Sequence, residues 1–307
     1  METAQAPIKQ EGITMINKNF IDYYWNGEAL ASLVGARRAG PDSLYVPNFM
    51  QQLLEPSDLC AKLMDLRQYP WVDREESFMA YRGNPLNREK WLGIDGHYDH
   101  RLQKIQKFPR YGYTGAQWQG LLSYVDFSKI PLVNECVIKK FKQCFTFGSN
   151  TQDRAPFNIN HAIGTLYKDG NDYIGFHEDK PEDIRPNTPI VLVSLGEERE
   201  FHLKDNATSS IEVFVVQEGD LFILGPETNM VMKHSIVKLA DEQVLKRDKV
   251  GQRMSIVLRD IKTVLSRKTV LAKIENSCKQ KLQKDVKKRK ELEREESTQG
   301  TKKISKE

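Results

Sequence analysis

The chain has 307 residues, a net charge of +4, and a composition that is 39% hydrophobic and 29% charged. These totals are typical of a soluble globular protein with a polar appendage, and the length suits one large domain or two small ones. We expect no membrane partner, because no apolar run approaches the ~18 residues that a membrane helix needs.

The compartment is indicated by the start of the chain and by its cysteines. The first residues lack the basic-then-apolar order of a signal peptide, and the four cysteines are scattered and form no CxxC pair. We therefore expect the nucleus or the cytoplasm, where thiols stay reduced, and neither a disulfide framework nor a zinc cluster.

The first third of the chain is irregular. Residues 1–43 are predicted to be an N-terminal extension, which ends near a Gly-Pro break. The segment 44–50 (LYVPNFM) is typical of a strand, and 54–71 (LEPSDLCAKLMDLRQYPW) of a helix that Ser57 or Asp58 caps.

A second predicted helix covers residues 130–145, after the aromatic and basic stretch 72–120, which is rich in turn formers. Its apolar residues recur at helical spacing and therefore share one stripe. They are Val133, Val137, Phe141 and Phe145.

Beyond residue 157 the pattern becomes β-rich. Eight short apolar segments, separated by turn signals, fall within about 105 residues, which indicates a sandwich or a barrel. From about residue 263 the chain is a polar helix with a disordered end. A thin apolar stripe on this helix consists of Leu271, Ile274, Cys278 and Leu282.

The charge is concentrated in this C-terminal tail. Residues 262–307 contain 15 Lys and Arg and 7 Asp and Glu, so they carry +8 and the rest of the chain carries −4. Phosphate contact without sequence readout would explain the surplus. A solvated helix and a partner-binding helix are the alternatives, and the KKRK run also fits a nuclear localisation signal.

A histidine and an aspartate stand two residues apart in the segment YIGFHED, as His177 and Asp179. Residues i and i+2 of a strand share a face, so the two side chains point together. His234, in the β-rich segment MKHSIV, is the best third ligand. Two histidines and one carboxylate leave open positions for a co-substrate and O₂ in non-heme Fe(II) sites. The alternative is a surface or core pair of polar residues.

The segment RMSIVLR adds a second signal. Arg253, Ser255 and Arg259 alternate with apolar residues, so both arginines share one strand face. Such a face is either solvated or holds an anion, and a guanidinium binds a carboxylate in bidentate fashion. The segment HYDH (97–100) lacks such an arginine pattern, and we expect His97, Asp99 and His100 to lie in a loop.

Together these motifs resemble the AlkB family of Fe(II)/2-oxoglutarate dioxygenases. The shared order is Tyr167, then HxD ten residues later, then a histidine and RxSxxxR. The segment FPRYGYTG, upstream of the β-rich region, strengthens the resemblance, which extends over about 44–261.

The resemblance implies a fold that is mainly β with flanking helices (α+β), built on a double-stranded β-helix (jelly roll) and followed by a helical basic tail. The expected dioxygenase domain covers 44–262, with a substrate lid at 72–120, a jelly-roll core at 157–261 and the tail at 263–307.

Site residues are carried over from the same motifs. His177, Asp179 and His234 resemble the iron ligands, and Arg253 and Tyr167 resemble the residues that bind the distal carboxylate of 2-oxoglutarate. Arg259 resembles the second arginine, near the metal aspartate. Thr165 and Ser255 stand where many members carry asparagine, so they keep a hydrogen-bonding group of shorter reach and are included in the cofactor site.

The activity implied is oxidative demethylation of N-alkylated bases in DNA or RNA, in DNA repair or in the removal of RNA modifications. Fe(II) is the implied cofactor, and 2-oxoglutarate and O₂ are co-substrates. We expect a monomer with nucleic acid as its partner. The alternatives are a hydroxylase or demethylase of protein substrates, and a non-catalytic nucleic-acid-binding barrel.

The expected lid offers residues for the substrate. Flipped bases stack on aromatic side chains, and basic residues contact phosphates. Aromatic residues packed beneath the lid are the alternative. The substrate-binding candidates are Tyr111, Tyr113, Trp118, Arg110, Arg82 and Arg88.

Overall fold

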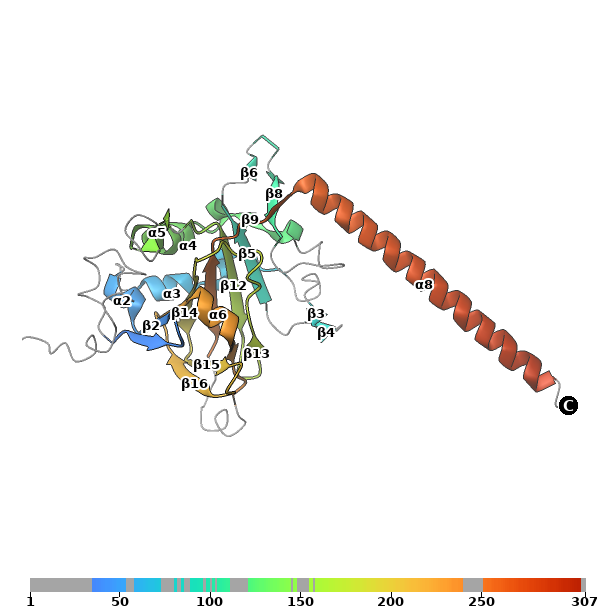
Figure 1. The fold of residues 1–307 in the computed structure, drawn as a ribbon. Helices are drawn as coiled ribbons and strands as arrows, with labels where there is room; N and C mark the ends of the chain where they lie inside the picture. The colour runs from blue at the N-terminus through green and yellow to red at the C-terminus, as the bar shows by residue number, and fades with distance from the viewer. Residues whose placement is uncertain are drawn as a thin grey trace, which may run out of the picture.

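The computed structural model describes most of the chain between Gly35 and Ile304. The ranges outside the described residues are 1–34, 54–57, 73–79, 82–83, 86–88, 96–97, 100, 103, 111–120, 145, 148–154, 157, 240–250 and 305–307. In the described part, two β-sheets pack against each other, short helices cover one side, and one long helix extends away from the body (Figure 1).

The large sheet has eight strands, in the order β1-β2-β17-β14-β19-β12-β5-β9. Its neighbours are antiparallel, except that β5 and β9 are parallel. The strands are β1 (Arg37–Ala39), β2 (Ser43–Val46), β5 (Glu89–Ile94), β9 (Val125–Asp126), β12 (His161–Tyr167), β14 (Ile190–Gly196), β17 (Leu221–Leu224) and β19 (Arg253–Arg259).

The small sheet has four antiparallel strands, in the order β13-β18-β15-β16. They are β13 (Ile174–His177), β15 (Arg199–Asp205), β16 (Ile211–Val216) and β18 (Met232–Ile236). Buried side chains from both sheets, such as Phe222 and Phe201, form one core cluster between them. Two antiparallel sheets that pack face to face with long crossovers make a jelly roll, so the predicted fold class is confirmed.

Short elements complete the molecule. The small ribbons are β3 (Ala80–Tyr81) with β4 (Asn84–Pro85), β6 (Tyr98–Asp99) with β7 (Lys104–Ile105), β8 (Lys107–Pro109) with β20 (Val264–Ser266), and β10 (Thr146–Phe147) with β11 (Ala155–Pro156). The helices are α2 (Phe49–Leu53), α3 (Leu59–Leu63), η2 (Leu66–Gln68), η4 (Phe127–Lys129), α4 (Pro131–Val133), η5 (Asn134–Ile138), α5 (Lys139–Cys144), α6 (Pro226–Val231) and α8 (Arg267–Ile304). No helix in the described part is long and apolar enough to cross a membrane.

The outer face of the large sheet is covered by α4, η5 and α5, which run on from one another at the predicted helix 130–145. Val133, Val137 and Phe141 are buried there against Met254 and Ile256 of β19. The predicted stripe therefore faces the core, except that Phe145 lies outside the described residues. The opposite face of the same sheet points toward the small sheet.

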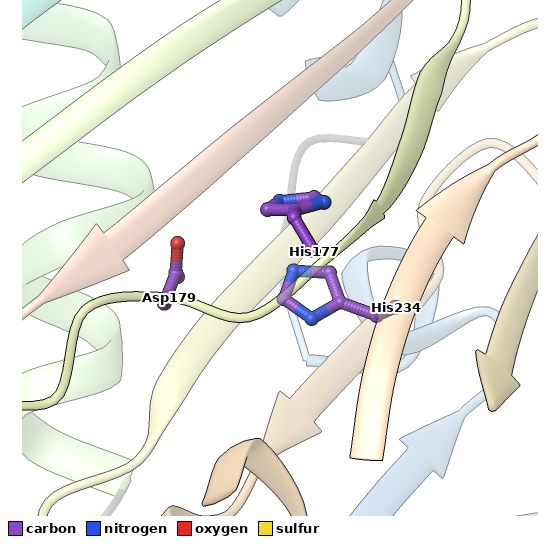
Figure 2. A group of neighbouring side chains, drawn as sticks. All are labelled: His177, Asp179 and His234. Carbon is purple, nitrogen blue, oxygen red and sulfur yellow. The ribbon is translucent and has the colours of Figure 1, made fainter. Parts of the chain in front are cut away.

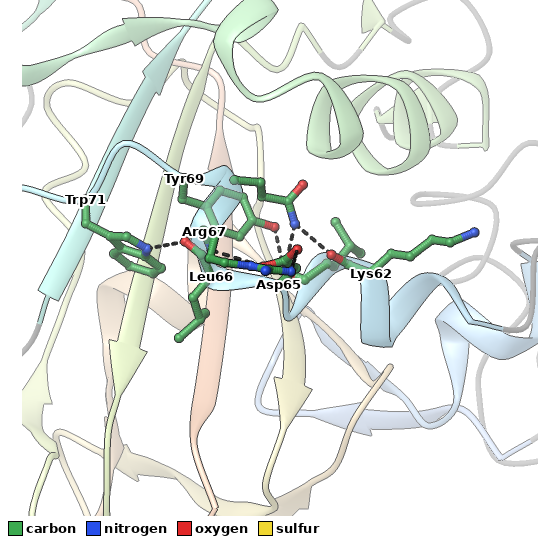
Figure 3. A network of polar contacts seen from close by, with 8 residues as sticks. Lys62, Asp65, Leu66, Arg67, Tyr69 and Trp71 are labelled. Atoms are coloured by element: carbon green, nitrogen blue, oxygen red, sulfur yellow. Dashed lines mark hydrogen bonds and ion pairs between the residues drawn. The ribbon is translucent and has the colours of Figure 1, made fainter.

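The predicted helix at 54–71 is shorter in the structure. In the described part of this range, residues 58–71, only α3 and the single turn η2 form, because side chains bind the last carbonyls of α3 (Figure 3). The Tyr69 hydroxyl donates to the carbonyl of Leu63 at 2.7 Å, and Gln68 Nε2 donates to that of Lys62 at 2.7 Å. Asp58 occupies the N-cap but makes no capping bond, and it pairs with Lys62 instead; Ser57 lies outside the described residues.

The strand predicted at 44–50 is also shorter, since β2 ends at Val46 and α2 begins at Phe49. Asn48 turns the chain between them with a φ of 51°. Asparagine tolerates this left-handed conformation better than most residues do.

Two predicted boundaries differ from the structure. The N-terminal extension contains β1, which pairs with β2, so the large sheet begins at Arg37 rather than at residue 44. The predicted lid contains β5, which pairs with β12 and buries Trp91 completely. The Trp91 indole stacks on Tyr69, with ring centroids 5.2 Å apart. This part of the segment 72–120 therefore belongs to the core, and the large sheet reaches beyond the predicted jelly-roll core 157–261.

The predicted tail also begins inside the fold. β20 pairs with β8, and Val270 at the start of α8 is fully buried in a cluster that includes Leu265 and Ile274. Leu271 and Leu282 of the predicted stripe are instead 46% and 65% exposed. The helix is thus anchored by its first turns, and a truncation at residue 263 would remove part of the core.

We expect Gly164→Ala to destabilise the fold, because a Cβ on Gly164 of β12 would lie 1.9 Å from Trp91 Nε1. Inserting an atom into a packed core costs about 1–3 kcal/mol. Gly175→Ala is the matched control, since nothing lies within 4 Å of its Cβ. Urea unfolding followed by circular dichroism measures both. Equal midpoints for the two variants would contradict the packing of Trp91 on Gly164.

Candidate metal centre

Three side chains, two from adjacent strands of the small sheet and one from the loop that follows the first of them, converge (Figure 2). His177 ends β13, and the strand register pairs it directly with His234 of β18. Asp179 lies two residues further, in the loop after β13. One ligand atom from each residue lies within 4.8 Å of the others. Asp179 joins the histidines because the chain bends after the strand, whereas strand alternation was the sequence-based reason.

The two imidazoles are prepared to bind a metal in their neutral form. His177 Nδ1 lies 2.9 Å from the carbonyl of Gly175, which fixes Nδ1–H as a donor and puts the lone pair on Nε2. Burial, together with the nearby His177, lowers the pKa of His234 to about 3. A cationic His234 is thus disfavoured at neutral pH.

Asp179 is held by a buried arginine. Arg259 ends β19 and donates from Nε and Nη2 to Asp179 Oδ2, at 3.0 and 2.7 Å. Both side chains are 7% exposed. Charge-assisted bonds of this kind are short and directional, so Arg259 fixes the orientation of the carboxylate beside the two histidines.

A second buried arginine stands further along the same strand face. Arg253 is 2% exposed, and among the described residues its Nε and Nη1 have no hydrogen-bond partner. It lies opposite Tyr167 in the β12–β19 register, with its Cζ 5.0 Å from the ring centroid. Burial lowers the pKa of Arg253 to about 10, and Tyr167 opposes that shift. The guanidinium therefore stays charged at neutral pH.

Hydroxyl groups line the sheet next to this arginine. Thr165 pairs with Ser255 in the β12–β19 register, and Ser255 pairs with Ser194 of β14. All three are buried. A buried cation with unbonded N–H groups, flanked by hydroxyls and a phenol, fits a carboxylate.

Some residues of this centre lacked a local sequence signal. Asn229 of α6 accepts from the backbone N–H of Asp179 and donates to its carbonyl, at 2.9 and 2.8 Å. His161 is fully buried opposite Arg259, and its Nε2 lies 2.7 Å from the Tyr124 hydroxyl. Burial holds the pKa of His161 well below its usual value.

The predicted substrate residues are only partly placed. Arg110 is 45% exposed and donates to Asp183 from Nε at 2.8 Å. Its role toward phosphates stays a prediction. Asp99 of the HYDH segment lies in the short strand β6 and not in the predicted loop, and its carboxylate accepts from the backbone of Arg101 and Leu102 in the turn that follows. The residues outside the described ranges are Tyr111, Tyr113, Trp118, Arg82, Arg88, His97 and His100.

The donor set of this centre fits Fe(II). Two histidines and one carboxylate on one side of a metal form the facial arrangement of non-heme iron sites, which leaves positions open for other ligands. The orphaned N–H groups of Arg253 lie on the same inner face, where they fit the far carboxylate of a bidentate co-substrate such as 2-oxoglutarate.

Arg253→Lys is expected to weaken 2-oxoglutarate binding at least ~10-fold, about 1.4 kcal/mol, because lysine keeps the charge but loses the planar fork. Calorimetric titration of the anaerobic Fe(II) protein measures this. Arg67→Lys, at a position that is 90% exposed, serves as the control. An unchanged affinity in Arg253→Lys would move the carboxylate site elsewhere, with Arg259 as the next candidate.

Comparison with known proteins finds one family model and several relatives. The family model described as "2OG-Fe(II) oxygenase superfamily" matches residues 44–259. DNA oxidative demethylase ALKBH2 of Mus musculus is 33% identical over 86 residues, which are 25% of this chain and 36% of that protein. The Homo sapiens ALKBH2 is 35% identical over 86 residues, or 25% and 33% of the two chains. The match thus spans about a third of the length of these relatives.

Other matches are more distant. The RNA replication protein of Grapevine virus A (isolate Is 151) is 30% identical over 84 residues, which are 27% of this chain and 5% of that protein. The solved structure of OsALKBH1 is 12% identical and has a TM-score of 0.44, with 73% of this chain and 99% of that chain covered.

The family model covers most of the chain and includes the ligand cluster, Arg253 and Arg259. The AlkB-like resemblance is confirmed by the ALKBH2 relatives. The chain therefore belongs to the 2OG-Fe(II) oxygenase superfamily and is an oxidoreductase that uses Fe(II), 2-oxoglutarate and O₂.

Proposed function

We propose that this oxygenase removes N-linked methyl groups from bases in DNA or RNA. The observation that carries the chemistry is the His177–Asp179–His234 cluster beside the buried, partly unbonded Arg253. The similarity to ALKBH2, whose name states DNA oxidative demethylation, supports the substrate class.

Each residue of the centre has a separate task. His177, Asp179 and His234 would hold Fe(II), and Arg253 with Tyr167 would bind the distal carboxylate of 2-oxoglutarate. When bound, the iron and 2-oxoglutarate supply the activation of O₂ and the oxidation of a substrate C–H bond. Arg259 holds the ligand Asp179 in place, and the apolar core between the sheets keeps water away from the buried charges.

Two half-exposed arginines that are bound by buried carboxylates, one of them in the loop after Asp179, support a nucleic-acid substrate. Asp183, four residues beyond Asp179, is buried and binds Arg110, while the buried Asp260 binds Arg185 at 2.8 Å. The side chains of Arg110 and Arg185 remain 45% and 48% exposed. A buried carboxylate that fixes one edge of a guanidinium leaves its other N–H groups for a phosphate.

The competing functions are a protein hydroxylase or demethylase and a non-catalytic nucleic-acid-binding barrel. The complete ligand cluster disfavours the barrel, because a binding module needs neither the metal ligands nor a buried Arg253. We further propose that the protein acts as a monomer in the nucleus or cytoplasm, in DNA repair or in the removal of RNA modifications.

Incubation with Fe(II), 2-oxoglutarate and DNA or RNA oligonucleotides, each carrying one N-methylated base, tests the proposal. We expect at least one oligonucleotide to lose a methyl group, as mass spectrometry detects, and His177→Ala to abolish this loss together with succinate formation. A panel of lysine-methylated and proline-containing peptides runs in parallel.

Modification of peptides alone would replace the proposal with the protein-directed alternative. If Fe(II) and 2-oxoglutarate bind but none of the substrates in either panel leads to succinate formation, the proposed demethylation is wrong and the non-catalytic barrel is favoured.

A further inference from the structure

The long C-terminal helix α8 is the largest feature that the proposed reaction does not use. It spans Arg267–Ile304, 38 residues, so its axis is about 57 Å long at 1.5 Å per residue. Figure 1 shows it extending away from both sheets. Beyond Ser277, every residue of the helix whose side chain the structure describes is exposed.

The root of α8 is fixed by specific contacts. The backbone N–H of Arg267 donates to the carbonyl of Gln106 at 2.7 Å, and its Nη1 donates to that of Ile105 at 3.2 Å. The Ser266 hydroxyl accepts from the N–H of Thr269 and caps the first turn. With Val270 buried, these contacts set the direction in which the helix leaves the body.

The exposed part of the helix is strongly basic. Residues 267–290 contain ten Lys and Arg and only two acidic residues, Glu275 and Asp285, so they carry +8. Ion pairs of the helix involve Lys279 with Glu275 and Lys287 with Glu291. Exposed pairs of this kind contribute little, and within residues 267–290 ten basic residues stand against two acidic ones; four further acidic residues follow within 291–296.

The distribution of the side chains favours a polyanion over a partner helix. Residues 287–290 are four consecutive basic residues, and at 100° per residue they surround the helix instead of forming one face. A coiled-coil seam that begins at Leu271 and Ile274 would continue through Cys278 and then reach Lys281, Asp285 and Lys288, where apolar residues are required.

The root of α8 also lies beside the proposed substrate residues. The backbone N–H of Arg110 donates to the carbonyl of Thr263, which precedes β20. The same Arg110 binds Asp183 in the loop that follows the metal ligands. A nucleic acid bound near the metal centre would therefore meet the first turns of α8.

We propose that α8 is a rigid arm that binds the phosphate backbone of a nucleic acid without reading its sequence. The choice of nucleic acid rests on the proposed function, whereas the surface itself is remote from the metal centre. The arm would lengthen the bound segment of substrate and hold it near the site between turnovers.

The test replaces charge without shortening the helix. The quadruple variant Lys287→Gln, Lys288→Gln, Arg289→Gln and Lys290→Gln is compared with the control Leu282→Gln and Val286→Gln, which alters two exposed apolar residues, 65% and 46% exposed. Binding of an unmethylated 40-nucleotide strand is measured by fluorescence anisotropy across a salt series, without iron or 2-oxoglutarate.

We expect the quadruple variant to bind at least ~10-fold more weakly at low salt, and the slope of log affinity against log salt to fall by about 3, since each phosphate contact contributes roughly 0.7 for a single strand. The control should bind like the unmodified chain. An unchanged slope in the quadruple variant would overturn the proposal.

Sedimentation of the same proteins tests the alternative that α8 is a partner-binding helix. Self-association that the Leu282→Gln and Val286→Gln control abolishes would show a partner helix and overturn the arm. The binding measurement uses unmethylated strands and no cofactor. It can therefore support the arm even if the demethylation assay is negative, and demethylation can be detected even if the arm binds no nucleic acid.

A different observation concerns the geometry of the metal carboxylate. Asn229 binds both backbone groups of Asp179, as a neighbouring strand would. Asn229 lies on α6, whose N-terminus is capped from the far end of the chain: Asp42, in the β1–β2 turn, accepts from the N–H groups of Glu227 and Thr228 at 2.8 and 2.7 Å. α6 then runs directly into β18, which carries His234.

The geometry points to Asn229 as a positioning residue for the metal carboxylate. Asp179 lies beyond the end of β13, and the amide of Asn229 binds both its backbone N–H and its carbonyl. Both side-chain hydrogen bonds that Asn229 makes in the described structure go to the backbone of Asp179, so it acts through Asp179.

Asn229→Ala is expected to weaken Co(II) binding, a spectroscopic substitute for Fe(II), by about 10–100-fold, as loss of outer hydrogen bonds does at other metal sites. The Co(II) absorption spectrum should also change shape. The control is Met230→Ala on the same helix, where the side chain is 59% exposed.

Thermal unfolding of the metal-free proteins distinguishes positioning from stability. A lower melting temperature in Asn229→Ala with an unchanged Co(II) affinity and spectrum would show a purely structural residue and overturn the assignment. Asn229→Asp keeps the acceptor for the Asp179 N–H but loses the donor to its carbonyl. Its Co(II) affinity should therefore lie between that of the unmodified protein and that of Asn229→Ala.

Discussion

The buried ion pair between Arg259 and Asp179 is the interaction on which the centre depends. It joins the end of β19 in the large sheet to the loop after β13 of the small sheet, with both side chains 7% exposed. Removing one partner of such a pair leaves a buried charge uncompensated, which costs about 3–5 kcal/mol. The carboxylate proposed as a metal ligand is therefore also a contact between the two sheets, so the geometry of the site depends on how the sheets pack.

The same inner face carries a second buried cation, Arg253. Arg253 keeps two N–H groups without hydrogen bonds among the described residues, and an unsatisfied buried group of this kind is costly. A bound dicarboxylate would offset this cost and would stabilise the folded state by an amount that grows with the logarithm of its concentration. Specificity for a charged co-substrate thus follows from the burial of the arginine more than from the shape of the site.

Contacts across long sequence distances complete the centre. The β1–β2 turn caps α6 through Asp42, and α6 supplies Asn229 to the backbone of Asp179 and leads into the strand of His234. Gly225, which precedes α6, has no room for a Cβ, because Asp42 atoms would lie 2.2 Å from it. The residues around Arg37 are therefore part of the catalytic scaffold, and the long α8 is the element of the described chain that stands apart from it.

The sequence by itself determined the ligand set and the arginine face. HxD spacing and the alternation of RMSIVLR are local patterns, because strand side chains alternate with a period of two, and the structure brings His177, Asp179, His234 and Arg253 to one side of the barrel. The amphipathic stripe of Val133, Val137 and Phe141 was also predictable, since helical spacing marks a buried face.

Only the tertiary structure decided the register of β13 against β18, the place of Asp179 beyond its strand, and the inclusion of β1 and β5 in the large sheet. Asn229 and Asp179 are 50 residues apart, and Asp42 and Thr228 are 186 apart. Hydrogen bonds over such distances leave no periodic signature in the chain, because they depend on which strands become neighbours once the apolar faces have packed.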